Sequence, residues 1–404
     1  MELLDNPIRP YAWGSRTVLA ELLGRAVPAP HPQAELWLGA HPGDPSRLRS
    51  GATLLEALRA DPEGLLGADR ARKWDDTLPY LLKVLAADEP LSLQAHPSLA
   101  QAMAGFAAEE RAGIARDAAD RNYRDANHKP ELICALTEFH ALVGFRNPGA
   151  TVEMLRELAV PELDAYTALL AAQPCSEGLR ALFTTLITLP QSVLDMLVPA
   201  LQLGCVRLAG VDGPFRTEAR TLLELSERYP GDAGVLAAVL LNRITLAPGE
   251  AVYLPAGNLH SYLHGAGIEL MANSDNVLRG GLTPKHVDMP ELLRVLDFAA
   301  APPPVLTGTP EGAWLRYDTP FEEFLLRRYE SGPALDPAAG PVAVPDGGPR
   351  ILLCTAGAAC LRGADRELRL ARGASAWFGA GDTGATVAPL VEGSQLFLAG
   401  DALG

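Results

Sequence analysis

Cysteine is scarce in this chain of 404 residues, which holds five in all. Cys134, Cys175, Cys205, Cys354 and Cys360 are odd in number and form no Cys-x-x-Cys pair. We therefore expect neither a disulfide framework nor a thiolate metal site. No uninterrupted apolar run reaches the roughly 18 residues of a membrane span, and the first residues lack the basic start and apolar core of a signal peptide. A cytoplasmic protein that crosses no membrane is predicted.

Positive charge is also in short supply. The chain has 34 Lys and Arg against 49 Asp and Glu, a formal charge of −15. An acidic surface repels phosphate backbones, so no nucleic-acid partner is expected. The length and the 48% of hydrophobic residues fit two or three domains with buried cores.

Glycine (38) and proline (34), by contrast, are plentiful, which indicates many turns. Short apolar runs between turn residues predict strands in 1–147 and again in 241–305, with helices over 53–66, 98–117 and 290–296. Leucines at helical spacing predict a helical domain over 148–240. A Pro/Ala linker at 299–304 precedes a glycine-rich, strand-like domain over 306–404 that contains no histidine.

An internal similarity refines this architecture. Residues 246–260 can be laid over 370–384, and both read as a strand, a glycine turn and a second strand, although chance similarity of glycine-rich hairpins is an alternative. Such units are typical of the double-stranded β-helix (cupin) sandwich. His260 falls opposite Gly384, so the second sandwich would lack a metal ligand. Residues 379–384 also satisfy the dinucleotide pattern GxGxxG, but Ala385-Thr-Val-Ala-Pro389 comes next and cannot start a long helix, so a nucleotide site is rejected.

Leu91-Ser-Leu-Gln-Ala-His-Pro97 is the first stretch that points to chemistry. Alternate side chains of a strand share a face, so Ser92, Gln94 and His96 point one way and the apolar residues between them the other. This pattern predicts a strand between a wet cavity and a core. A solvent-facing edge strand is the alternative.

Tyr123-Arg-Asp-Ala-Asn-His-Lys-Pro-Glu131 is the second stretch. The same parity puts Lys129 and Glu131 on one side and His128 on the other. A carboxylate with a cation beside it suits a metal or an anionic substrate. A polar loop before a buried strand is the alternative.

The stretch from Tyr253 to His264 is the third. If it is extended, His260, Tyr262 and His264 share a face, and His264 is expected in the core or at the rim. Together with the first two stretches it offers imidazoles, a carboxylate and an amide oxygen, which are donors that Zn²⁺ accepts.

The fourth stretch, residues 267–286, brings cations together in a chain that has few of them. Arg279 and Lys285 lie at turns, in a segment that also contains Glu269 and Asp275. Such a concentration predicts an anionic substrate such as a phosphate ester. An ordinary solvated loop is the alternative.

Several motifs in this order resemble the type I phosphomannose isomerases. The matching pieces are Tyr11-Ala-Trp-Gly14, Glu35-Leu-Trp-Leu-Gly-Ala-His41-Pro, the stretches at 91–97 and 127–131, Tyr253-Leu-Pro-Ala-Gly-Asn-Leu-His260-Ser-Tyr262, and Arg279-Gly-Gly-Leu-Thr-Pro-Lys285. They span about residues 1–300. Ala40 departs from the threonine usual in the family before His-Pro, which weakens a role for His41.

The resemblance implies a zinc-dependent aldose–ketose isomerase that interconverts mannose 6-phosphate and fructose 6-phosphate through a cis-enediol. It implies a mainly β protein: a cupin-type catalytic domain (1–147 and 241–305), a helical domain (148–240) and a second, degenerate cupin-like β domain (306–404). One zinc ion per chain would be held by Gln94, His96, Glu131 and His260.

The resemblance also suggests roles for further residues. Arg279 would stabilise the charge of the enediol, and Lys285, Ser92 and either Lys83 or Lys129 would hold the phosphate. Candidate proton carriers are His41, Lys129, Glu269 and a metal-bound water. The remaining expected substrate contacts are Tyr262 and Asp275.

Two other functions stay open at this point. Two histidines and one carboxylate also form the triad of non-haem Fe(II) oxygenases, although Gln94 and the cations suit a sugar phosphate better. A sugar-binding cupin without activity is the non-enzymatic alternative. The expected partner is a small sugar phosphate, and the chain is expected to be a monomer or a weak homo-oligomer.

Overall fold

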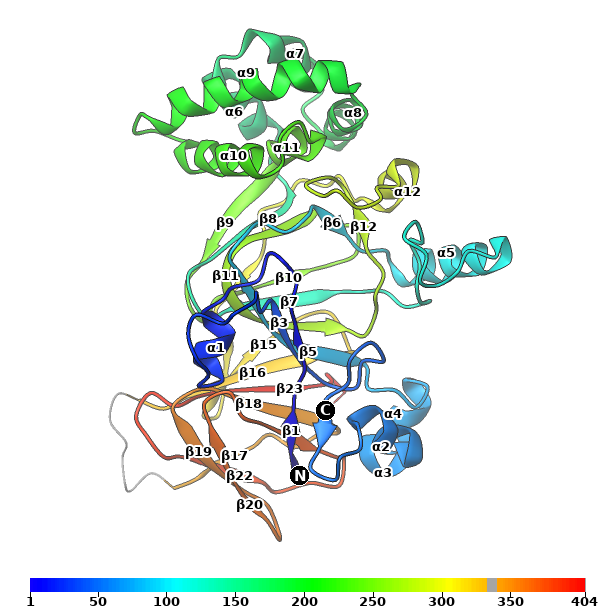
Figure 1. The fold of residues 1–404 in the computed structure, drawn as a ribbon, viewed down its shortest axis with the longest axis vertical. Helices are drawn as coiled ribbons and strands as arrows, with labels where there is room; N and C mark the ends of the chain where they lie inside the picture. Colours follow the sequence, from blue (N-terminus) through cyan, green and yellow to red (C-terminus); the bar gives the residue numbers. More distant parts are fainter. Residues whose placement is uncertain (333–339, 404) are drawn as a thin grey trace.

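The structure is a computed structural model that describes residues 1–332 and 340–403. It combines helices with antiparallel sheets, so the mixed architecture predicted from the sequence is confirmed (Figure 1). A helical block lies at one end of the long axis, an eleven-stranded sheet assembly occupies the middle, and the C-terminal strands lie at the other end (Figure 1).

The eleven-stranded assembly carries the site. Its main path is β13-β10-β7-β11-β5-β3-β2, and β8, β9, β6 and β12 join it off that path. The bounds are β2 (Ile8–Arg9), β3 (Glu35–Leu38), β5 (Tyr80–Ala87), β6 (Gln94–Ala95), β7 (Glu131–Ala135), β8 (Phe139–Phe145), β9 (Leu241–Leu246), β10 (Ala251–Leu254), β11 (His260–Ala272), β12 (Leu278–Arg279) and β13 (Val305–Leu306).

Strand β11 connects the two parts of this assembly. Its first residues pair with β6 and β8, and from Gly265 onward it pairs with β5 and β7. Gly265 has φ +117°, and a Cβ there would lie 2.5 Å from the carbonyl oxygen of Glu138, so only glycine fits at this change of partners. The strand thereby places residues at both of its ends against different neighbours.

Helices fill residues 148–238, where the leucine spacing predicted a helical block. Its elements are α6 (Pro148–Leu158), η1 (Pro161–Leu163), α7 (Asp164–Ala172), α8 (Ser176–Ile187), α9 (Gln191–Ala209), α10 (Arg216–Arg228) and α11 (Ala233–Ala238). Their leucines share one apolar core with Leu93 and Ala95 of the β6 segment and with Leu282. The block is therefore packed onto the strands that carry the site.

Helix α9 is long and apolar enough to cross a membrane by length and composition, with a mean hydropathy of 1.4. It also contains Asp195 and Arg207, and it packs against α10 with Leu194 and Leu201 buried. A core helix passes the same test, so α9 carries no inference about a membrane.

The C-terminal strands form an eight-stranded sheet, β14-β15-β16-β23-β18-β21-β1-β4, and a four-stranded one, β17-β22-β19-β20. Their bounds are β1 (Glu2–Asp5), β4 (Arg47–Leu48), β14 (Thr309–Glu311), β15 (Trp314–Tyr317), β16 (Leu325–Glu330), β17 (Val342–Ala343), β18 (Arg350–Ala356), β19 (Ala358–Arg362), β20 (Glu367–Ala371), β21 (Ser375–Phe378), β22 (Thr386–Pro389) and β23 (Gln395–Gly400). The GxGxxG residues 379–384 lead into strand β22 and not into a helix, as expected.

Residues 1–147 were expected to belong to the catalytic domain throughout. Two N-terminal strands, β1 and β4, instead belong to the eight-stranded sheet. Strand β1 pairs with β21 and β4, so it completes the sheet of the C-terminal strands. This pairing joins segments that lie far apart in the sequence, so no local sequence pattern predicts it.

The remaining helices are α1 (Val18–Leu22), α2 (Leu54–Ala60), α3 (Pro62–Leu66), α4 (Ala68–Lys73), α5 (Leu99–Ala112) and α12 (Met289–Val295). The single helix expected over 53–66 is wrong, because Asp61 ends α2 and caps α3, with Pro62 as the first residue of α3. The helix expected over 98–117 ends early, since Gly113 takes a left-handed conformation. The short helix near 290–296 is confirmed as α12.

Candidate metal centre and active site

Strand pairing gathers four residues that lie far apart in the sequence. His260 opens β11 and is the register partner of Gln94 on β6, and Gln94 is in turn the partner of Arg279 on β12. Glu131 opens β7, the other neighbour of β11. The side chains expected to bind a metal and the expected active-site arginine therefore come from adjacent strand ends.

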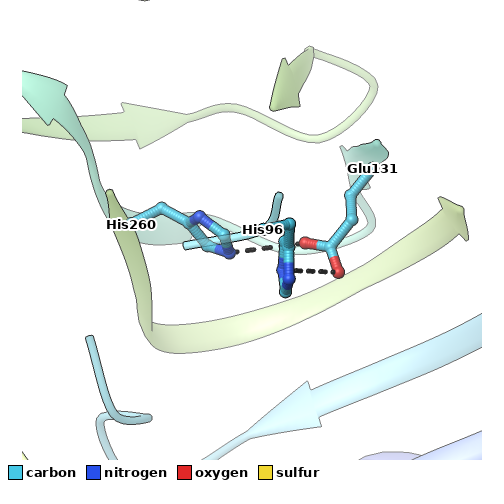
Figure 2. A group of neighbouring side chains, drawn as sticks. All are labelled: His96, Glu131 and His260. Carbon is cyan, nitrogen blue, oxygen red and sulfur yellow. Dashed lines mark ion pairs between the residues drawn. The ribbon is translucent and has the colours of Figure 1, made fainter. Parts of the chain in front are cut away.

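His96, Glu131 and His260 form a buried group (Figure 2). Nε2 of His96 lies 3.3 Å from Oε1 of Glu131, and Nε2 of His260 lies 3.4 Å from Oε2 of the same carboxylate. Donors about 2.1 Å from a zinc ion at the tetrahedral angle would be about 3.4 Å apart. Among the described residues, this is the group of His, Cys, Asp and Glu able to hold a metal ion.

Hydrogen bonds orient both imidazoles toward the carboxylate. Nδ1 of His96 donates to the carbonyl oxygen of Asn276 at 2.8 Å, and Nδ1 of His260 donates to that of Asn258 at 3.1 Å. With the proton on Nδ1, each Nε2 presents a lone pair. Both lone pairs then face carboxylate oxygens, and two acceptors repel each other unless a cation lies between them.

At His96, a proton does not supply that cation at neutral pH. Burial, and then the charge of Lys129, lower the pKa of His96 to about 4. Its buried Nε2 has no hydrogen-bond partner in the described part of the chain. An orphaned nitrogen facing a carboxylate fits a metal ion held between them.

A cavity of about 50 Å³ opens beside this group. Its described lining residues are Glu35, Lys83, Leu85, Leu91, Gln94, Lys129, Glu131, His260, Tyr262 and Glu269. Gln94, the fourth ligand expected, thus faces the same space as Glu131 and His260. Ser92 is half-buried and is not among these lining residues.

Lys129 contacts the carboxylate directly, with Nζ 2.9 Å from Oε1 of Glu131. Burial alone would raise the pKa of Glu131, but Lys129 and His96 outweigh it and hold that pKa well below the ordinary value. Glu131 is therefore a buried carboxylate that stays ionised. His128 points away to Glu323 at 2.6 Å, which confirms that it faces away from Lys129 and Glu131.

Lys83 forms a second buried charge cluster on the cavity wall. Its Nζ lies 2.9 Å from Glu269 and 3.7 Å from Glu35, whose other oxygen accepts a hydrogen bond from the indole of Trp37. Burial opposes the charge of Lys83, but the two carboxylates outweigh it and raise its pKa. Burial also raises the pKa of Glu269, against the effect of Lys83.

Tyr262 lies on the same wall. Burial, together with Glu269 and Glu131, raises the pKa of its hydroxyl well above the ordinary value. That hydroxyl is buried and has no hydrogen-bond partner in residues 1–332 and 340–403. A neutral hydroxyl that faces the cavity is available to a ligand.

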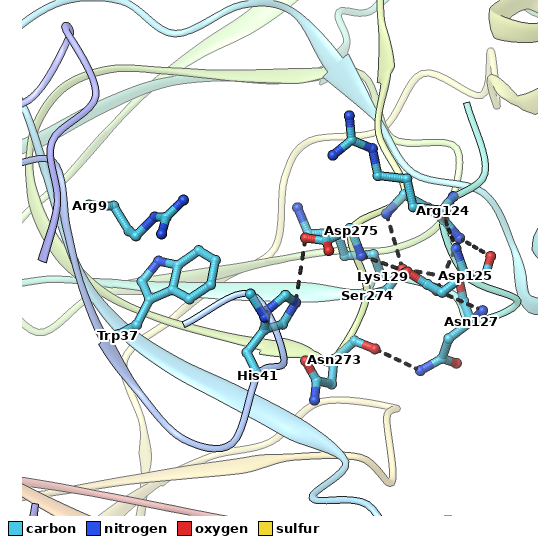
Figure 3. Close-up of polar contacts among 12 residues, drawn as sticks. Arg9, Trp37, His41, Arg124, Asp125, Asn127, Lys129, Asn273, Ser274 and Asp275 are labelled. Carbon is cyan, nitrogen blue, oxygen red and sulfur yellow. Dashed lines mark hydrogen bonds and ion pairs between the residues drawn. The ribbon is translucent and has the colours of Figure 1, made fainter. Parts of the chain in front are cut away.

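His41 and Asp275 form a pair near Lys129 (Figure 3). The backbone N–H of Gly43 donates to Nδ1 of His41, and Nε2 lies 3.4 Å from Oδ1 of Asp275. The contact with His41 lowers the pKa of Asp275. Asp125 accepts a hydrogen bond from the backbone N–H of Asp275 at 2.8 Å and so anchors this loop.

Arg279 and Lys285 have a third cation near them, Arg124, which the sequence analysis missed. Burial and then Arg124 lower the pKa of Arg279, and burial, Arg279 and Arg124 lower that of Lys285. Like charges held this close together attract an anion. Arg124 lies within the stretch that ends at Glu131, so its charge was the signal that could have found it.

Asn276 was also missed. It is fully buried, its carbonyl orients His96, and its side chain binds the backbone at Arg124, Asp125 and Asn127. It links the loop of Arg124 to the metal group. A buried amide in a polar stretch carries no sequence signal that separates it from a surface asparagine.

Fold and site together define a class: a mainly antiparallel sheet protein with a buried histidine–carboxylate group able to hold a metal beside a cluster of cations. A family model of the type I phosphomannose isomerase catalytic domain matches residues 1–148. The chain is 38% identical to mannose-6-phosphate isomerase of Escherichia coli (strain K12) over 395 residues, which is 96% of this chain and 97% of that protein. It is 34% identical to the human enzyme over 81% of both chains.

Solved structures agree. A crystal structure of mannose 6-phosphate isomerase bound with zinc and yttrium superposes with a TM-score of 0.89 at 36% identity, covering 100% of both chains. The Salmonella typhimurium enzyme bound to fructose 6-phosphate and zinc also has a TM-score of 0.89, at 36% identity and the same coverage. The chain belongs to the type I phosphomannose isomerase family, and the family expected from its motifs is confirmed.

Replacement of Lys83 by methionine tests the buried charge cluster. Lys83→Met leaves Glu35 and Glu269 buried without their cation, which we expect to lower the free energy of unfolding by roughly 3 kcal/mol at about pH 8. Burial already raises the pKa of Glu269 above that of the unfolded chain, and loss of the Lys83 cation raises it further, so the folded variant binds more protons. Its stability should therefore rise as the pH falls from about 8 to about 5.5, measured by urea unfolding.

Lys73→Met is the control, because Lys73 pairs with Glu322 at the surface. Its unfolding free energy should change by about 0.5 kcal/mol or less, without that pH dependence. An equal loss of unfolding free energy in the two variants would contradict the stabilising role of Lys83 in the buried charge cluster.

Proposed function

We propose that this chain is a zinc-dependent aldose–ketose isomerase that interconverts mannose 6-phosphate and fructose 6-phosphate. The observation that carries the proposal is the convergence of His96, Glu131 and His260, through acceptor atoms, on one buried point beside a cluster of cations. Relatives at 38% identity are named for this activity, and one with the same fold holds zinc and fructose 6-phosphate.

One zinc ion per chain would be held by His96, Glu131, His260 and Gln94. The three-residue group and the position of Gln94 on the same cavity support this set. Zinc bound there supplies a positive charge that polarises substrate oxygens. With a single carboxylate among the ligands, the site keeps a net charge of about +1 for that purpose.

The phosphate group would bind to Lys285 and Arg124, where an anion relieves the repulsion that Arg279 and Arg124 exert on Lys285. Lys83 is left out of the phosphate contacts expected from the sequence, because Glu269 and Glu35 already neutralise it inside the protein. The phosphate lies far from the reacting carbons, so its binding energy orients them.

The reaction moves a proton between C2 and C1 of the open-chain sugar through a cis-enediol. Arg279, on the strand next to Gln94, would stabilise the negative charge that develops on the enediol oxygens. Of the expected proton carriers, Glu269 best meets the chemical requirement, since its pKa is raised toward neutrality and it lines the cavity. Tyr262 would contact a sugar hydroxyl, and His41 with Asp275 would orient the substrate.

The finer architecture is part of the proposal. We assign the eleven-stranded assembly to a cupin-type catalytic domain and the C-terminal sheets to a second cupin-like domain without metal ligands. In both repeats of the internal similarity, successive strands lie in different layers: β9 pairs with β8 and β10 with β7, and β20 pairs with β19 and β21 with β18. Location, oligomeric state and the lack of membrane or nucleic-acid partners stay predictions.

The Fe(II) oxygenase and the non-catalytic sugar-binding protein are not favoured. The family relatives are isomerases, and the chain retains each expected ligand and Arg279.

A coupled assay with purified protein and mannose 6-phosphate tests the function. We expect fructose 6-phosphate to form, the activity to be lost after treatment with a chelator, and zinc to restore it. Formation of fructose 6-phosphate at an unchanged rate in metal-free protein would rule out the zinc-dependent mechanism. No product from zinc-loaded protein would rule out the isomerase.

Two histidines of strand β11 provide a matched pair for the metal site. His260→Ala removes one donor and should lower the affinity for zinc by a factor of about 10 or more. The variant should then retain less zinc after dialysis, as measured by elemental analysis. His264→Ala, four residues along the same strand, changes an exposed side chain and should keep one zinc ion per chain. Equal zinc contents in both variants would refute His260 as a ligand.

Arg279 should act on the reaction and not on the metal. Arg279→Ala should lower kcat by about 10²–10³-fold, while the zinc content stays that of the wild type. Arg156→Ala, an exposed residue in the last turn of α6, should leave both values unchanged. A near-normal kcat for Arg279→Ala would refute its role.

A further inference from the structure

The connection 228–234 runs from the last residue of α10 into the start of α11. It contacts the residues that precede strand β6. Arg228 forms an ion pair with Glu89, and the hydroxyl of Tyr229 donates to the carbonyl oxygen of Pro90 at 2.7 Å. Gln94 and His96 come shortly after Pro90 in the sequence. The helical block therefore touches the active-site frame at a defined place.

The same connection also holds a second segment, the loop after Arg279. Oδ1 of Asp232 accepts hydrogen bonds from the backbone N–H groups of Gly234, at 2.7 Å, and Leu282, at 3.0 Å. Its Oδ2 accepts one from the N–H of Thr283 at 3.2 Å. One carboxylate thus joins the start of α11 to the backbone between the two cations Arg279 and Lys285.

Backbone packing brings these partners close together. Gly281 has φ +115°, and a Cβ there would lie 2.7 Å from the Cα of Gly234. Leu282 has φ +55°, a conformation that a leucine rarely adopts without support. Its side chain is 1% exposed, in the apolar core of the helical block. The helical block therefore imposes the shape of this loop.

The other side of the loop is joined to the metal segment. The N–H of Gly280 donates to the carbonyl oxygen of Leu93 at 2.8 Å, and the N–H of Leu93 donates to that of Gly281 at 3.1 Å. The loop is thus held between the strand that carries Gln94 and the side chain of Asp232.

We propose that Asp232 is a positioning residue, which holds the loop 280–285 so that Arg279 and Lys285 keep the spacing that a sugar phosphate needs. The inference rests on the proposed function. Two hydrogen bonds from the loop to one carboxylate, which also accepts from Gly234 of α11, order a loop that its own backbone preferences would not. The inserted helical block then serves the reaction without contacting the substrate.

Kinetics of Asp232 variants test this role. Asp232→Ala should raise the KM for mannose 6-phosphate and the inhibition constant of inorganic phosphate together, each by about tenfold or more, because small displacements of binding groups are costly. The zinc content should stay at the wild-type value. Asp232→Asn keeps the oxygen that binds Gly234 and Leu282 but loses the acceptor for Thr283, so both constants should rise by less.

Asp61→Ala is the matched control. Asp61 is an exposed residue that caps α3 by accepting from the N–H of Gly64 at 3.0 Å, and it lies far from the loop in the sequence. It should lower the thermal midpoint while both constants stay within about twofold of the wild type. If the alanine variant of Asp232 does not fold, the asparagine variant carries the test.

Two results would overturn the inference: both constants within about twofold of the wild type in the Asp232 variants, or an equal rise in Asp61→Ala. The outcome is separable from the proposed function. If the wild type does not isomerise mannose 6-phosphate, the proposed function fails. Calorimetric binding of inorganic phosphate to the zinc-loaded wild type and variants then still decides whether Asp232 shapes an anion site.

Discussion

The buried carboxylate of Glu131 is the charge around which the rest of the site is arranged. Two imidazole nitrogens and the Lys129 ammonium all lie within 3.4 Å of its oxygens. A buried anion is tolerable only with compensating charge. The imidazoles are held with lone pairs toward it, so Lys129 and a metal ion are what balance it. The orientation of His96 by the carbonyl of Asn276 follows from the same requirement.

Charge is separated by depth across the site. Near the metal group, Lys83 is enclosed by Glu35 and Glu269, and this buried cluster is closed to an outside anion. Arg279, Lys285 and Arg124 lie further out, and no ion pair with a carboxylate neutralises them in the described part of the chain. Burial and the repulsion between these cations lower the pKa values of Arg279 and Lys285. In a chain with a net charge of −15, this local excess of cations attracts anions to one part of the surface.

The helical block contacts the two segments that carry Leu93 and Leu282, and these contacts stabilise the site. It shares an apolar core with Leu93, Ala95 and Leu282, and its connection 228–234 adds polar contacts to the same region. Loops that bind ligands are usually the least stable parts of a fold. Here a packed helical unit stabilises a loop whose leucine would not adopt its backbone conformation alone.

The sequence by itself determined the kinds of side chain at the site and the family, because alternation along short strands and the order of the motifs are local properties. It also indicated the helical block over 148–240, since leucine spacing is local too. Only the tertiary structure decided that Glu131 faces both His96 and His260, that Arg124 and Asn276 join the site, and that β1 completes the C-terminal sheet. These relations depend on strand pairing and loop packing between residues far apart in the chain, as between Asn276 and Arg124 at a separation of 152, and no local pattern encodes them.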